Sequence, residues 1–102
     1  MKEYAIQFMP FPEDKQGKIL GTTVYLGGMY IIFIDTTRPK DEQKLTTKHE
    51  LAHILLNHFN QPWRSDEEIE AEAESKAMKM SDNELQRLLN IATQIAISEK
   101  KP

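Results

Sequence analysis

The sequence has no cysteine, so it can hold neither a disulfide nor a zinc ion ligated by thiolates. Histidine and the carboxylates remain as strong metal ligands. No apolar run approaches the roughly 20 residues that a membrane-spanning helix requires, and residues 1–10 lack the apolar core and cleavage site of a signal peptide. We therefore expect a cytoplasmic protein without a membrane partner.

An excess of charge of one sign is also missing. The formal net charge is −3, and the lysines and arginines are scattered among acids without forming a basic patch. Direct binding to nucleic acid is therefore not expected. The 102 residues suffice for one core but leave no room for a separate substrate-binding lobe. We expect a single domain, residues 1–102, with any cleft between its own elements.

Residues 1–35 are expected to carry the strands. Residues 3–8 predict a short strand, and β-branched residues mark another between 18 and 26. Gly27-Gly28 is a tight-turn signal, so the apolar run 29–35 completes a hairpin. That run does not alternate with polar residues, which predicts a strand covered on both faces.

Three helices are expected in the rest of the chain. Pro39, followed by acids, predicts a helix over about 41–59, while Ser65 and Ser81 each begin a capping-box pattern. These patterns predict further helices over about 65–80 and 81–100. The fold class is therefore α+β, with a small antiparallel sheet of about three strands packed on three helices.

The most informative stretch is His49-Glu50-Leu51-Ala52-His53, which lies inside the first expected helix. Residues four apart share a helix face, so His49 and His53 can ligate one ion. In zinc peptidases with this pattern, the glutamate takes a proton from the attacking water and returns it to the leaving amine. The spacing therefore predicts Zn²⁺ as cofactor and Glu50 as the catalytic residue.

A third protein ligand is needed, because catalytic zinc normally has three. On one continuous helix His58 would lie off the ligand face, and no glycine precedes it to turn the chain, so we expect a surface or cleft-lining role. The other candidates are downstream acids. A carboxylate from the second helix, packed antiparallel against the first, would complete the site between the two helices. The residues leave Glu68, Glu70 and Glu72 open.

The chain resembles the ImmA/IrrE family of HExxH metallopeptidases, a zincin-like group. The matching pieces are the hairpin strand, the HELAH motif with His58 after it, and the stretch Glu68-Ile69-Glu70-Ala71 with Met78-Lys79-Met80-Ser81. Ser81 stands where the family has proline, Glu74 where it has an aromatic residue and Ser75 where it has alanine. In this register the resemblance implies Glu68 as the third metal ligand and Glu72 as a residue that orients a ligating histidine.

The resemblance further implies a zinc-dependent endopeptidase that acts on a protein or peptide. Relatives encoded by phages and mobile elements cut a helix-turn-helix transcriptional repressor, which makes such a repressor a candidate partner. The metal and either His58 or a tyrosine such as Tyr30 would stabilise the oxyanion. Substrate would add as a strand to the hairpin edge. The alternative is a latent or non-catalytic metal-binding interaction module, although such a module would have no use for Glu50.

Overall fold

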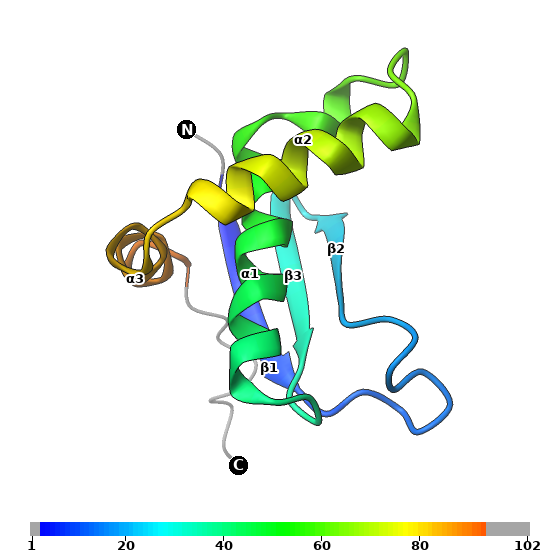
Figure 1. Ribbon diagram of the computed structural model, residues 1–102, viewed down its shortest axis with the longest axis vertical. Coiled ribbons are helices and arrows are strands. Elements are labelled where there is room, and N and C mark those ends of the chain that lie inside the picture. Colours follow the sequence, from blue (N-terminus) through cyan, green and yellow to red (C-terminus); the bar gives the residue numbers. More distant parts are fainter. Residues whose placement is uncertain (1–2, 94–102) are drawn as a thin grey trace.

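The computed structural model describes residues 3–93, which form a three-stranded sheet and the helices that cover it (Figure 1). The strands are β1 (Tyr4–Met9), β2 (Gly21–Leu26) and β3 (Met29–Asp35), in the sheet order β1-β3-β2. The expected hairpin is present, because β2 pairs antiparallel with β3 across Gly27 and Gly28, whose φ angles are 61° and 83°. Glycine adopts these positive angles without steric cost.

The sheet is mixed, which corrects the expectation of an antiparallel sheet. β1 runs parallel to β3, from the Tyr4–Tyr30 pair to the Met9–Asp35 pair. The connection of residues 10–20 crosses the end of β3 instead of turning back beside β1, so the most apolar strand occupies the centre. The α+β class itself is confirmed.

The central strand is fully covered on one face only. Tyr30, Ile32 and Ile34 are buried, whereas Ile31 and Phe33 are half-buried. The prediction of a strand covered on both faces was therefore wrong for the second face. The buried face packs against the helices and fixes the side of the sheet on which a site can form.

The helices are α1 (Lys40–Leu55), the 3-10 turn η1 (His58–Asn60), α2 (Asp66–Lys79) and α3 (Asp82–Asn90). Both predicted helix starts are capped, since the hydroxyls of Ser65 and Ser81 accept hydrogen bonds from the N–H groups of Glu68 and Glu84. α1 ends earlier than predicted, because Asn57 takes a left-handed conformation with φ 60°. α3 also ends before its predicted limit, and the continuation from residue 94 lies outside the described residues.

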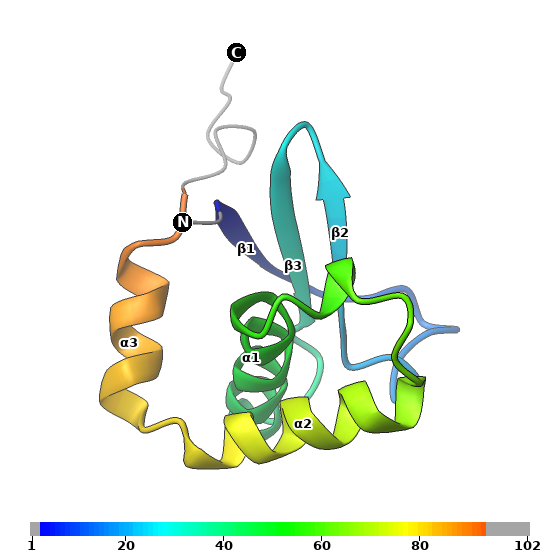
Figure 2. The same cartoon turned by 90° about the horizontal axis from the view of Figure 1, so that it is seen from above.

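α1 lies between the sheet and α2, with α3 to one side (Figure 2). The core joins the buried face of the sheet to Leu51 and Ile54 of α1 and to Leu85 and Leu88 of α3. Lys48 of α1 also holds the start of α3 in place. Its Nζ donates to the carbonyl of Met80 and lies 3.1 Å from Asp82 Oδ1. Among residues 3–93, no helix has both the length and the apolar character needed to cross a membrane.

Candidate metal centre

α1 presents both motif histidines on one face. Their ring centroids are 4.8 Å apart, and the two Nε2 atoms approach to 3.2 Å. His53 is buried and His49 is half-buried, so the pair lies at the edge of the core. Two imidazole nitrogens that face each other at this distance need a proton or a cation between them.

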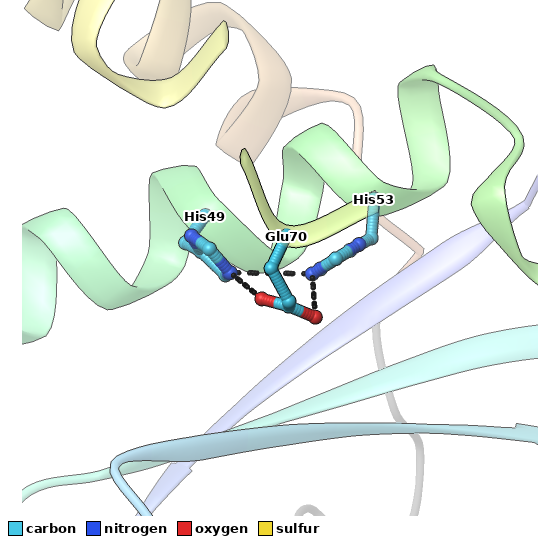
Figure 3. Close-up of side chains that lie close together, drawn as sticks. All are labelled: His49, His53 and Glu70. Atoms are coloured by element: carbon cyan, nitrogen blue, oxygen red, sulfur yellow. Dashed lines mark hydrogen bonds and ion pairs between the residues drawn. The ribbon is translucent and has the colours of Figure 1, made fainter. Parts of the chain in front are cut away.

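α2 brings one carboxylate to these nitrogens, that of Glu70 (Figure 3). Its Oε1 lies 2.9 Å from His49 Nε2, and its Oε2 lies 3.3 Å from His53 Nε2. The three side chains form a cluster whose ligand atoms all lie within 4.8 Å of one another. The expected site between the first two helices therefore exists as a His, His, Glu constellation.

The geometry does not support the preference for Glu68 as the third ligand. The side chain of Glu68 is 64% exposed and points to Arg64, whose Nε lies 3.5 Å from its Oε1. Glu68 belongs to the first turn of α2, where its backbone N–H donates to the hydroxyl of the N-cap residue Ser65. Glu70 stands two residues further, on the side of the helix that faces the histidines. The structure therefore brings Glu70, and not Glu68, to the two histidines.

The packing of α2 explains this register. Ala73 and Ala77 are its buried residues, and their small side chains let α2 lie close across α1. Glu70 precedes Ala73 by three residues and therefore shares its face of the helix. The alanine pair is visible in the sequence and supports the Glu70 alternative.

His58 lines the cleft, one of the two roles expected for it, but it is also buried beside His53, which was not expected. Because Asn57 turns the chain through a left-handed conformation, His58 comes back toward α1, and it is only 5% exposed. Its Nδ1 lies 3.0 Å from Nδ1 of His53, and its Nε2 lies 2.7 Å from Oε1 of Glu72. Asn57 supplies this turn without a glycine, since asparagine tolerates this region.

These contacts assign the protons of the chain His53, His58 and Glu72. The Glu72 carboxylate only accepts, so His58 carries its proton on Nε2 and offers Nδ1 as an acceptor to His53. His53 then donates through Nδ1, which leaves its Nε2 lone pair pointing at the cluster. His49 repeats the arrangement, with its Nδ1 3.5 Å from Glu74 Oε1. An outer partner for each ligating imidazole is typical of metal sites.

The pKa shifts favour the protonation states that a cation requires. Burial lowers the pKa of His53, which keeps the imidazole neutral. Burial raises the pKa of Glu70, but the hydrogen bond from His49 and the proximity of His53 outweigh this and lower it overall. Hydrogen bonds from His58 and Arg64 also lower the pKa of Glu72. These directions favour a neutral His53 and ionised carboxylates at Glu70 and Glu72.

The donor set fits a zinc ion. A tetrahedral zinc ion holds nitrogen and oxygen ligands at about 2.0–2.2 Å, which separates them from one another by about 3.3 Å. The two Nε2 atoms lie 3.2 Å apart, and each lies 2.9 or 3.3 Å from a different oxygen of Glu70. Two imidazoles and one carboxylate also leave a fourth position for water or substrate.

Glu50 lies beside this cluster and faces the edge strand β2. Its Oε1 accepts a hydrogen bond from the Thr23 hydroxyl at 2.5 Å. A cleft of about 380 Å³ contains Glu50, Thr23, His53 and Glu70 together. The motif carboxylate, two of the three cluster residues and the strand edge therefore line one cleft.

Neither expected oxyanion donor, His58 or Tyr30, presents a free donor group in this cleft. Both nitrogens of His58 are engaged, by His53 and Glu72. Tyr30 is buried, packs between Tyr25 and Phe59, and is not among the residues of this cleft. Neither residue is placed to bind an oxyanion at the cluster.

Comparison with known proteins supplies one further finding. The sequence model of a peptidase family, described as the IrrE N-terminal-like domain, matches residues 3–96. This span contains all the strands and helices that build the cluster. The comparisons with curated proteins and with solved structures found no significant match.

Proposed function

The chain belongs to the IrrE N-terminal-like domain family of peptidases, as its resemblance to the ImmA/IrrE enzymes predicted, and from this premise we propose a zinc-dependent endopeptidase. His49, His53 and Glu70 are its metal ligands and Glu50 is its general base. The observation that carries the proposal is the convergence of α1 and α2. They bring two imidazoles and a carboxylate within 4.8 Å beside an acid in a cleft.

The ion, when bound, would supply a Lewis acid that polarises the scissile carbonyl and acidifies the attacking water. Glu50 would accept a proton from that water and return it to the leaving amine. Thr23 orients Glu50, because its hydroxyl donates to Oε1 and leaves Oε2 for the proton transfer.

His58, Glu72 and Arg64 would hold His53 in its ligating orientation. Oε1 of Glu72 accepts from both His58 and Arg64, so two donors hold this carboxylate oxygen in place. His58 in turn accepts the Nδ1 proton of His53, which keeps the ring from rotating. This is a positioning role, exerted through His53.

The edge of β2 is the proposed binding site for the substrate backbone. Asp35 donates its N–H to the carbonyl of Leu20, so with alternating pairing the main-chain groups of Gly21, Thr23 and Tyr25 point away from β3. An extended peptide can pair with those groups as an added strand. It would then pass directly over Glu50. A partner repressor with an extended segment is the substrate that we propose.

A Glu50→Gln variant tests the enzyme against its alternative. The amide keeps the shape and the contact with Thr23 but cannot take a proton, so we expect kcat/KM on an unstructured protein to fall by roughly 10²–10⁴. Zinc content should not change, and Glu67→Gln, an exposed acid on α2, should behave as wild type. Cleavage by Glu50→Gln at the wild-type rate would contradict the proposal and favour the interaction module.

A further inference from the structure

A second pocket continues the cleft along β2. It has a volume of about 500 Å³ and shares Thr23 and Phe59 with the cleft that holds Glu50. Its walls are the rings of Tyr25, Tyr30 and Phe59, with centroids 4.9 and 5.3 Å apart between neighbours. The proposed catalytic machinery does not use these rings.

The register of β2 connects the pocket to the candidate catalytic site. Side chains on one face of a strand recur every second residue, about 7 Å apart. Thr23 contacts Glu50 on that face, and Tyr25, the next residue on the same face, lines the pocket. A peptide paired with β2 advances at the same spacing. A side chain close to the scissile bond would therefore enter the pocket.

We propose that this aromatic pocket, formed by Tyr25, Tyr30 and Phe59, binds a bulky apolar side chain of the substrate within two residues of the cleaved bond. The substrate class is therefore an extended segment that carries a residue such as phenylalanine, leucine or methionine at one defined position. The inference rests on the proposed function, whose cleft it extends.

The aromatic walls of the pocket favour a bulky apolar side chain. Three aromatic rings offer a large apolar surface and favour stacking or edge contacts with another ring. The volume falls within the roughly 300–1,000 Å³ of ligand pockets, so a large side chain fits and a small one leaves apolar surface wet. Glu3 is the one carboxylate that lines the described pocket, and it is exposed to solvent. An acidic side chain is disfavoured there.

The test is the side-chain preference of cleavage in a library of unstructured peptides. Wild type should cut with a bulky apolar residue enriched at a single position near the bond. Tyr25→Ala removes one wall, and because Tyr25 is 64% exposed the fold should tolerate it. We expect the preference for phenylalanine over alanine to fall by about tenfold. Leu26→Ala is the matched control, since Leu26 is 66% exposed on the same strand but does not line the pocket.

Measuring peptide binding separates the test of the pocket from the test of catalysis. If wild type cuts no peptide, binding to the Glu50→Gln variant tests the pocket instead. The peptides compared differ only in carrying phenylalanine, alanine or lysine at one position. Tighter binding of the phenylalanine peptide, weakened by Tyr25→Ala and not by Leu26→Ala, supports the pocket even where the peptidase fails. Cleavage or binding without side-chain preference, or with selection of lysine through Glu3, would overturn the inference.

Discussion

His53 is the residue on which most of the site depends. It contacts His49 and Glu70 through Nε2 and His58 through Nδ1, so one buried ring connects the ligand cluster with the hydrogen-bond chain behind it. Glu72 ends that chain and is held by Arg64. Replacing Glu72 should therefore weaken metal binding, although Glu72 is not itself one of the proposed ligands.

Replacing Glu72 with alanine should weaken zinc binding by about 10–100-fold, because His58 loses its acceptor and no longer fixes the Nδ1 proton of His53. Competition with a chromophoric chelator measures the affinity. Glu67→Ala removes an exposed acid of the same helix and is the matched control. Equal zinc affinities in the two variants would show that the chain behind His53 does not orient it.

The sequence was sufficient to place His49, Glu50 and His53 because their spacing lies within one helix. The third acid depends on how α2 packs against α1, which is a non-local property that a motif register does not contain. Glu68 matched the pattern in sequence, yet its place in the capping turn points it at Arg64. The buried alanines of α2 were the physical signal for Glu70.

The left-handed turn at Asn57 is the decisive feature at the scale of elements. It ends α1, and η1 then carries His58 back to His53. A prediction of one continuous helix over 41–59 necessarily placed His58 on the wrong face. Asparagine tolerates positive φ less well than glycine, so the sequence signal for this turn was weak.

Asn57→Val should destabilise the metal-free protein by about 1–2 kcal/mol, because a β-branched side chain is strained at positive φ. Urea unfolding in the presence of a chelator measures the loss. Asn57→Gly is the control and should keep the stability near wild type, since glycine adopts this angle freely. Wild-type stability for the valine variant would mean that the turn is not under this constraint.

Local sequence patterns could not predict the sheet topology either. Strand propensity located all three strands, and Gly27-Gly28 located the hairpin. Which edge β1 joins depends on the path of residues 10–20, and no local signal encodes that path. The structure fixes both ends of the connection at Asp35, which accepts from the N–H of Phe11 and donates its own N–H to Leu20.

At the scale of the whole molecule, Asp35 links the end of β3 to the loop that contains Phe11 and to the turn that contains Thr37. Burial raises its pKa, but the N–H groups of Thr37 and Phe11 donate to the carboxylate and lower the pKa below its ordinary value overall. The ionised form therefore stabilises the fold above the unfolded pKa of about 4, and this contribution is lost as the pH falls through the folded value.

Acid titration of the metal-free protein checks this sign. The urea midpoint should decline as the pH falls from about 4 toward 2, and Asp35→Asn should be less stable at pH 7 yet show a smaller decline. Asp14→Asn changes an exposed loop residue and should keep the wild-type profile. A decline of equal size in Asp35→Asn and wild type would rule out Asp35 as its source.

The assembly of α1, α2 and the edge strand into one zinc site is the central claim for the molecule, and the zinc content of the purified protein tests it most directly. We predict about one zinc per chain by mass spectrometry, lost or strongly reduced in Glu70→Ala and retained in Glu68→Ala. Both acids are exposed residues of the same helix, so the two variants are matched. Loss of zinc in Glu68→Ala with retention in Glu70→Ala, or no zinc in wild type after addition of the metal, would contradict the account.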